Sequence, residues 1–179
     1  VRNSVFERYN STFDGGALYI VGNGTNVSST DFQYGHAVYG GAIYIEGENT
    51  TIEDSGFSYN NADADGGVIY VNGNYTVISN SRFSYSYADN SGGAIYINGI
   101  NTTIHSSNFT YGNATKGYAG SIYVEGDYAN ITGDSFKFST AINGGAIYVA
   151  GYRATISDSY FQQNNVTSRT GEGGTIFIE

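Results

Sequence analysis

Hydrophobic and polar positions alternate in a unit that recurs along the whole chain. Each unit opens with two small residues, usually a glycine pair, and continues with alternating aliphatic and aromatic residues; residues 40–45, for example, read GGAIYI. Successive units lie 25 to 29 residues apart, and a period of this size indicates stacked structural repeats. The second residue of each pair is numbered zero below, and it stands at Gly16, Gly41, Gly67, Gly93, Gly120, Gly145 and Gly174.

Columns of like residues are fixed relative to position zero. Ile, Val or Leu occupies +2 and +4, Val or Ile occupies +11, and Phe occupies +16, with no insertion between zero and +16 in six units. All variation in length falls between the Phe and the next glycine pair. Because a slip of one residue would turn every side chain to the wrong face, this constancy predicts that like residues lie on like residues. The variable segment is expected to be a surface loop, where insertions are tolerated.

The alternation predicts three short strands in each unit. Positions +1 to +5 are rich in Ile, Tyr and Val, which favour strands. Position +5 is mostly polar, as in Glu46 and Asn72, so +3 is expected to face outward with it, while +2 and +4 face inward. A second strand is expected around +11, and a third carries the Phe at +16 and often a Tyr at +18. The tyrosines at +18 are Tyr34, Tyr59, Tyr85 and Tyr111.

These directions define an expected core and an expected outward aromatic stripe. The core ladders consist of Ile43, Ile45, Ile52, Phe57, Ile69, Ile78, Phe83, Ile95, Ile97, Ile104, Phe109, Ile122, Ile131, Phe136, Ile147, Ile156 and Phe161. The outward stripe consists of Tyr19, Tyr44, Tyr70, Tyr96, Tyr123 and Tyr148. Stacked aromatic side chains of this kind support one another between repeats, and an exposed stripe can also contact sugars or a neighbouring molecule.

Two positions are expected to turn the chain. Glycine occupies +6 in all six complete units, which suits a corner with positive φ. Positions +11 and +16 differ by an odd number, so both can face inward only if the chain bends between them. Turn-forming residues stand at +13, namely Asp54, Asn80, Gly133 and Asp158.

Together these elements predict an all-β fold, a parallel β-helix (β-solenoid) with about 26 residues and three short strands in each of six to seven coils. One coil buries about four large apolar side chains, worth roughly 6–12 kcal/mol. Ordering the backbone of one coil costs more, at about 1–2 kcal/mol per residue, so only a stack of coils is stable. A single domain, residues 1–179, is expected as a piece of a longer solenoid. Its coils are 15–39, 40–65, 66–91, 92–118, 119–143 and 144–172, with partial coils 1–14 and 173–179.

Composition and charge exclude several classes of site and partner. The chain has no Cys, which excludes disulfides and cysteine metal sites, and its net charge of −9 argues against binding nucleic acid. No apolar run is long enough to insert into a membrane. The two histidines, His36 and His105, are expected to be solvated surface residues.

The GGAIY segment, followed by F-x-x-N at Phe57–Asn60 and Phe161–Asn164, resembles the polymorphic outer membrane protein repeat. That family includes adhesin-like surface proteins of bacteria and methanogenic archaea. The glycine half of the motif recurs throughout the chain, whereas F-x-x-N is absent after Phe83, Phe109 and Phe136. The resemblance implies a right-handed β-helix on the cell surface, extracellular and without catalysis, that serves in adhesion or in a wall, sheath or fibre. The implied partners are copies of the chain packed end to end or laterally, and surface glycans or host cells.

A polysaccharide-binding or polysaccharide-degrading β-helix of the pectate lyase-like class is the alternative. Such enzymes gather carboxylates on one exposed face across neighbouring coils, but Glu46 and Glu125 lie three coils apart, about 14 Å. That separation exceeds the distance between the two carboxylates of a glycosidase. Asp134, which replaces the usual Ser at +14, has no evident charged partner.

Ten N-x-S/T sequons make N-glycosylation a further expectation, although turn Asn and strand Thr are natural neighbours in such a repeat. No cofactor or metal is expected; the acidic segment of residues 61–65 (NADAD) has the oxygen ligands that calcium prefers but lacks the pattern of calcium-binding β-rolls. The sequon asparagines are Asn10, Asn23, Asn26, Asn49, Asn74, Asn101, Asn108, Asn113, Asn130 and Asn165.

Overall fold

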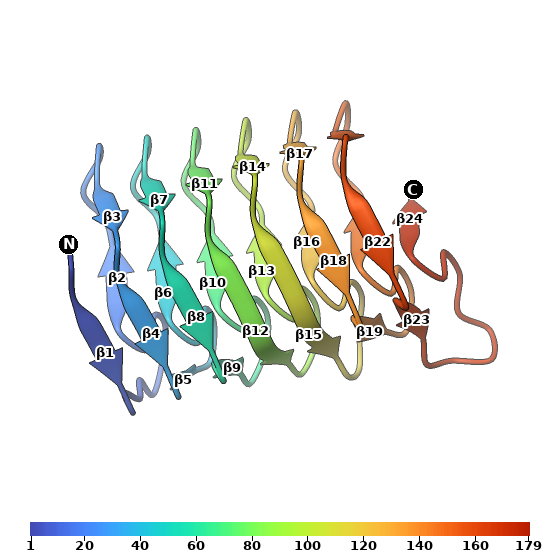
Figure 1. Ribbon diagram of the computed structural model, residues 1–179, viewed down its shortest axis with the longest axis horizontal. Helices are drawn as coiled ribbons and strands as arrows, with labels where there is room; N and C mark the ends of the chain where they lie inside the picture. Colours follow the sequence, from blue (N-terminus) through green and yellow to red (C-terminus); the bar gives the residue numbers. More distant parts are fainter.

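The computed structural model describes residues 1–179 as an all-β molecule of 24 strands without a helix. The strands form three parallel sheets, because the chain winds in stacked coils and each coil adds strands to every sheet. In Figure 1 the chain runs down the near face and up the far face while it advances toward the C-terminus, which is a right-handed winding. The predicted β-solenoid of about 26 residues per coil is therefore confirmed.

The first sheet contains seven strands and carries positions +2 to +4 of each unit. Every strand pairs in register with its counterpart, so that Ile69 lies beside Ile95 and Tyr70 beside Tyr96. The strands are β2 (Leu18–Ile20), β6 (Ile43–Ile45), β10 (Ile69–Val71), β13 (Ile95–Ile97), β16 (Ile122–Val124), β20 (Ile147–Val149) and β24 (Ile176–Ile178).

The second sheet contains six strands and places the aliphatic residue at +11 toward the core. Its register is the same, with Ile78 paired between Ile52 and Ile104. The strands are β3 (Asn26–Ser28), β7 (Thr51–Glu53), β11 (Val77–Ser79), β14 (Thr103–His105), β17 (Asn130–Thr132) and β21 (Thr155–Ser157).

The third sheet contains eleven strands and carries the Phe at +16, with Phe83 paired between Phe57 and Phe109. It is built from β1 (Val5–Glu7), β4 (Asp31–Gln33), β8 (Gly56–Ser58), β12 (Arg82–Ala88), β15 (Asn108–Ala114), β18 (Ser135–Lys137) and β22 (Tyr160–Gln162). Four further strands continue it beyond the Phe, namely β5 (His36–Ala37), β9 (Asn61–Ala62), β19 (Thr140–Ala141) and β23 (Asn165–Val166). The variable segment was expected to be a surface loop, and this is wrong in part, because its beginning still pairs from coil to coil.

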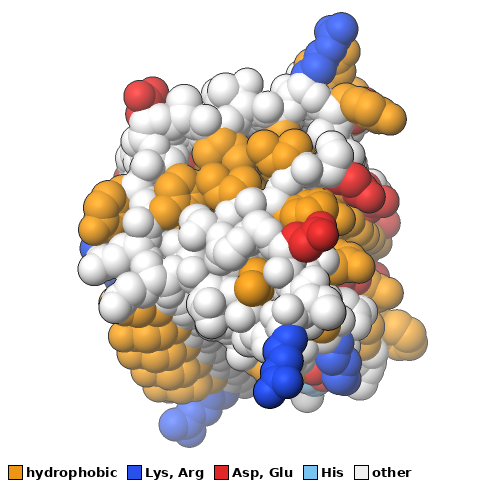
Figure 2. Space-filling view, turned by 90° about the vertical axis from the view of Figure 1, so that its right-hand side faces the viewer, with side chains coloured by type: hydrophobic (Ala, Val, Ile, Leu, Met, Phe, Trp, Pro, Cys, Tyr) orange, Lys and Arg blue, Asp and Glu red, His pale blue; other side chains and the backbone are white.

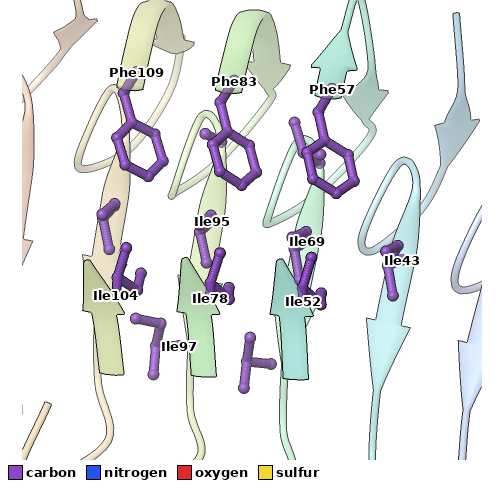
Figure 3. Packing of buried hydrophobic residues seen from close by; sticks show 14 of the residues in the cluster. Ile43, Ile52, Phe57, Ile69, Ile78, Phe83, Ile95, Ile97, Ile104 and Phe109 are labelled. Atoms are coloured by element: carbon purple, nitrogen blue, oxygen red, sulfur yellow. The ribbon is translucent and has the colours of Figure 1, made fainter. Parts of the chain in front are cut away.

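The core lies between the three sheets as one cluster of 26 buried side chains. Figure 3 shows ladders of isoleucine and phenylalanine that point into it from neighbouring coils. The expected core residues all lie in this interior, but Ile156 and Phe161 in the last complete coil are only partly buried. Phe side chains stack at ring-centroid separations of 4.7 to 5.0 Å from Phe6 to Phe161, so the core is continuous along the rod.

The glycine at +6 does not have positive φ, so the expected reason for that column is wrong. Positive φ occurs instead at −1, +8 and +18, and at the predicted bend of +13. Glycine is required at +6 because neighbouring coils approach there: a Cβ on Gly99 would lie 2.1 Å from the carbonyl oxygen of Gly73. Gly73 meets Gly47 in the same way, at 2.2 Å. The +6 column is therefore a ladder of close backbone contacts.

Candidate functional site

Two ladders of tyrosine side chains run along the outside of the solenoid, and they are the most regular surface features. The sheet-face ladder, at +3 on the first sheet, consists of Tyr19, Tyr44, Tyr70, Tyr96, Tyr123, Tyr148 and Phe177. The bend ladder, at +18 beside the third sheet, consists of Tyr34, Tyr59, Tyr85, Tyr111 and Phe138. Both have ring-centroid separations of 4.7 to 5.2 Å, close to the spacing of strands in a sheet.

The sheet-face ladder points away from the core, as predicted, but most of it is shielded from solvent. Only Tyr19 is exposed among its tyrosines, and Tyr148 is 6% exposed, which corrects the expectation of an outward-facing side chain there. The shielding comes from the variable segments: the ring of Tyr39 meets Tyr70 edge-on at 5.4 Å, and Tyr118 stacks on Tyr148 at 4.7 Å. The ladder is therefore a covered layer rather than an open stripe.

Burial and neighbouring carboxylates raise the pKa of the phenols in the sheet-face ladder. The hydroxyl of Tyr96 donates a hydrogen bond of 2.5 Å to Glu125. Burial, strengthened by this contact, raises the pKa of Tyr96 well above its usual value, and burial with the nearby charge of Glu125 raises the pKa of Tyr123 to about 12. The neighbouring carboxylate of Glu46 raises the pKa of Tyr19 to about 12. These phenols are neutral donors at physiological pH.

The bend ladder is the more exposed of the two. Its four tyrosines are 43 to 49% exposed, and their rings are parallel to within 2 to 11°. In Figure 2, which looks along the solenoid from its C-terminal end, a row of hydrophobic side chains recedes at the lower left, on the side of the third sheet. Each tyrosine has a φ between 52° and 57°, a left-handed conformation that bulky residues rarely adopt.

The left-handed backbone explains why alternation alone does not predict the bend ladder. Positions +16 and +18 have the same parity, so an unbroken strand would point both toward the core. At +18 the chain bends, and the tyrosine turns outward while the residue at +19 is buried, as with Asn60 and Ser86. The recurrence of Tyr at +18 in four consecutive units was the available signal.

Stacking decides what these rings can contact. Each interior ring of both ladders lies between two near-parallel neighbours, so both of its faces are already occupied by aromatic carbon. A platform that binds a sugar ring needs a free aromatic face. The ladders instead present ring edges and hydroxyl groups to the surroundings, and they hold neighbouring coils together.

The asparagine of F-x-x-N binds the bend of the preceding coil. The side-chain oxygen of Asn60 accepts hydrogen bonds from the backbone N–H of Gly35 (2.9 Å) and the hydroxyl of Tyr9 (2.6 Å), while its nitrogen donates to the carbonyl of Phe32. Asn164 bonds in the same way to the Ser139 N–H and the Phe136 carbonyl. The motif therefore satisfies backbone groups that the left-handed residue at +18 leaves without sheet partners.

The serine side chains at +14 form a ladder of hydrogen bonds between coils, and in one coil a carboxyl group replaces the hydroxyl. The hydroxyl of Ser81 accepts from the Ser55 N–H and that of Ser107 accepts from the Ser81 N–H. Asp134 takes this place in the next coil and accepts from the Ser107 N–H, but its second oxygen, Oδ2, is buried without a partner. Burial raises the pKa of Asp134 to about 6. It has no charged partner that would give it a catalytic role.

The remaining candidate residues do not come together. Glu46 follows β6 and Glu125 follows β16. These strands are three strand spacings apart in the first sheet, so the two carboxylates are separated by about 14 Å. His36 lies on strand β5 and contacts Asn10 and Asp63, at 3.1 and 2.9 Å, whereas His105 lies on β14. In the 61–65 segment Asp65 accepts from the Ser91 N–H. No group of three or more His, Asp or Glu side chains is arranged to hold a metal ion.

The sequon asparagines all lie at the surface or are half-buried. Four are hydrogen-bonded through their side-chain oxygens to the next coil. Asn23 accepts from the Glu48 N–H and Asn74 from the Ile100 N–H, while Asn10 contacts the ring of His36 and Asn113 accepts from the Thr140 hydroxyl. Asn26, Asn74, Asn101, Asn113 and Asn130 are half-buried. Asn10, Asn23, Asn49, Asn108 and Asn165 are exposed.

No protein-family model, curated protein or solved structure matches the chain. The chain also contains no helix that is long and apolar enough to cross a membrane. The resemblance to the polymorphic outer membrane protein repeat therefore stays a prediction from the motif.

Proposed function

We propose that this chain is a non-catalytic, rod-forming segment of an extracellular surface protein, either an adhesin-like β-solenoid or a component of a cell wall, sheath or fibre. The observation that carries the proposal is that the faces of the outward aromatic rings are occupied by neighbouring rings of the same ladder. The two outward columns of tyrosine, which would provide most of a ligand-binding surface, contact their own counterparts in adjacent coils. These rings therefore stabilise contacts between coils along the rod axis and leave no face of an interior ring free for a ligand.

Repetition of this kind suits a mechanical role. Three aromatic ladders and a ladder of close glycine contacts connect each coil to the next, and no coil can be stable without its neighbours. Stability of a solenoid is a sum over coils and their interfaces, so the length of the rod can be extended by adding coils. A chain of this design holds a fixed distance between whatever lies at its two ends.

An extracellular location and glycosylation belong to the same proposal. Five sequon asparagines are exposed. Among them, Asn108 and Asn165 lie on strands of the third sheet and Asn10 pairs with His36 at its edge. Copies of the chain, packed end to end or laterally, are the proposed partners. Surface glycans or host cells are the partners proposed for an adhesin-like role.

Polysaccharide binding is the second candidate, because the bend ladder presents four phenol hydroxyls at a regular spacing of about one strand. Hydroxyls can donate to and accept from a glycan even where ring faces are closed. Cleavage of the glycan is not part of this proposal, because Glu46 and Glu125, the carboxylates considered for it, lie three coils apart, about 14 Å.

Immunoelectron microscopy of the source cells with antibodies against the folded chain tests the proposal. Label on rods or a layer outside the cell envelope is the expected result, and label confined to the cell interior would contradict it. Binding of the purified chain to arrays of polysaccharides separates the two candidates. Micromolar binding to one polysaccharide, lost when Tyr59 and Tyr85 are both replaced by Phe, would favour the second candidate over a purely structural rod.

A further inference from the structure

The bend ladder contains four consecutive tyrosines whose rings are adjacent, parallel and exposed. Tyr34 and Tyr59 have ring centroids 5.2 Å apart, Tyr59 and Tyr85 4.7 Å, and Tyr85 and Tyr111 5.0 Å. The ladder ends in residues that are not phenols, with Arg8 at +18 of the first coil and Phe138 after Tyr111. Tyrosine pairs with this geometry have a chemistry that isolated surface tyrosines lack.

We propose that the bend ladder is a site of oxidative tyrosine cross-linking, in which dityrosine bonds join consecutive coils of one chain. The oxidant is hydrogen peroxide acting through a haem peroxidase, or another one-electron oxidant of phenols. Covalent bonds between coils would lock the rod against unwinding. The inference is independent of the proposed surface role, because it rests on the geometry and exposure of the rings.

The reaction balances as a two-electron oxidation of a tyrosine pair. Each phenol loses one electron and its hydroxyl proton to give a phenoxyl radical. The two radicals join through the ring carbons next to the C–O carbons, forming one C–C bond. Each of these carbons then releases its hydrogen as a proton while a phenol oxygen takes one up, which restores both aromatic rings. One molecule of hydrogen peroxide accepts the two electrons and two protons and becomes two molecules of water.

Geometry favours the bond within the chain over a bond between chains. The strands that flank the ladder hold successive tyrosines in register, with Phe83 paired to Phe57 and Phe109 two residues before the bend. The second phenoxyl radical therefore forms next to the first instead of having to diffuse to it, and such positioning raises the effective concentration greatly. Because about half of each side chain is exposed, the rings have room to tilt until the two carbons meet.

The sheet-face ladder has the same spacing but lacks the other requirements. Tyr70, Tyr96 and Tyr123 are half-buried, with rings from the variable segments packed against the ladder, so they cannot tilt freely. Shielding also keeps a macromolecular oxidant away from these rings. The proposal therefore places the cross-links at the bend ladder, where four consecutive coils each carry an exposed tyrosine.

The test treats dilute purified chain with a haem peroxidase and hydrogen peroxide, then measures dityrosine fluorescence and maps cross-linked peptides by mass spectrometry. We expect monomeric protein lighter by two hydrogen atoms per cross-link, with bonds joining Tyr34 to Tyr59, Tyr59 to Tyr85 or Tyr85 to Tyr111. The variant with all four tyrosines changed to Phe is expected to lose nearly all of the intramolecular product. Circular dichroism confirms that each variant is folded before oxidation.

Tyr75→Phe combined with Tyr128→Phe is the matched control. Both residues are as exposed as the bend ladder, at 49 and 47%, but they lie two coils apart with Asn101 between them in their column. This control variant is expected to yield as much intramolecular dityrosine as the parent. Cross-links found only between molecules, an unchanged yield in the fourfold Phe variant, or cross-links mapped to the sheet-face ladder would each overturn the proposal.

Discussion

The two tyrosine ladders have almost the same ring spacing and opposite environments. Tyr96 on the sheet face lies in a regular strand, is half-buried and donates its hydroxyl to Glu125. Tyr85 at the bend has a φ of 52° and is 47% exposed. The comparison teaches that the spacing comes from the stacked backbone, whereas exposure is determined by local backbone conformation and by what the variable segments cover. Ring stacking alone therefore does not identify a binding surface.

A charge placed in the core beneath both ladders has the largest expected effect. Ile95 is fully buried, and Ile95→Asp would place a carboxylate among isoleucines without a partner. We expect a loss of at least about 4 kcal/mol in the free energy of unfolding, enough to unfold the stack at room temperature. Ile100→Asp makes the same change in the same coil at a residue that is 38% exposed, and it is expected to stay folded. Equal melting temperatures for Ile95→Asp and the parent, measured by circular dichroism, would show that the assignment of inward positions is wrong.

Loosening the spacing of the coils is the next largest change. A Cβ on Gly99 would lie 2.1 Å from the carbonyl oxygen of Gly73, so Gly99→Ala must push two coils apart. We expect a loss of about 2–3 kcal/mol in urea denaturation. Gly22 lies in the same column but its Cβ would meet only the Thr25 hydroxyl oxygen, at 3.9 Å. If Gly22→Ala lost as much stability as Gly99→Ala, contact between coils would not be the reason for glycine at +6.

The same substitution in each ladder separates their energetics. Tyr96→Asn removes stacking on two neighbours, a hydrogen bond and a strand-forming residue, and it is expected to cost about 2–3 kcal/mol. Tyr85→Asn also removes stacking, but Asn tolerates the left-handed conformation that costs other residues roughly 1–2 kcal/mol, so the net loss should be about 1 kcal/mol or less. Chemical denaturation of the two variants measures the difference. A larger loss for Tyr85→Asn would mean that the bend ladder, not the sheet-face ladder, carries the stability.

Alkaline pH offers the mildest perturbation. The pKa of Tyr123 is raised to about 12 in the folded chain, mainly by burial and then by Glu125, whereas an unfolded tyrosine ionises near pH 10. An acid with a raised folded pKa contributes stability that is complete below about pH 10 and is lost as the pH rises toward about 12. Glu125→Gln removes the neighbouring charge and is expected to make this loss smaller. Denaturation midpoints between about pH 9 and pH 11 that fall equally in both proteins would rule out Glu125 as a cause.

Much of the fold was predictable because like residues recur at the same positions in every repeat. Fixed columns at +2, +4, +11 and +16 predict three sheets and their core, and the structure has them. The +6 glycines were misjudged because a sequence column does not distinguish positive φ from a close approach between coils; only the neighbouring carbonyl does. Tyr148 was misjudged because its shield, Tyr118, comes from a variable segment that no column constrains. The bend ladder required knowledge of φ at +18, where alternation fails.

Nuclear magnetic resonance of the tyrosine rings tests the central claim most directly, because it reports stacking and exposure separately. Nuclear Overhauser effects between ring protons are expected for Tyr59 with Tyr85 and for Tyr70 with Tyr96, pairs of residues that are 26 positions apart. A soluble paramagnetic probe should then attenuate the ring signals of Tyr85 more strongly than those of Tyr96. Ring contacts absent from either pair, or equal attenuation in the two ladders, would contradict the account.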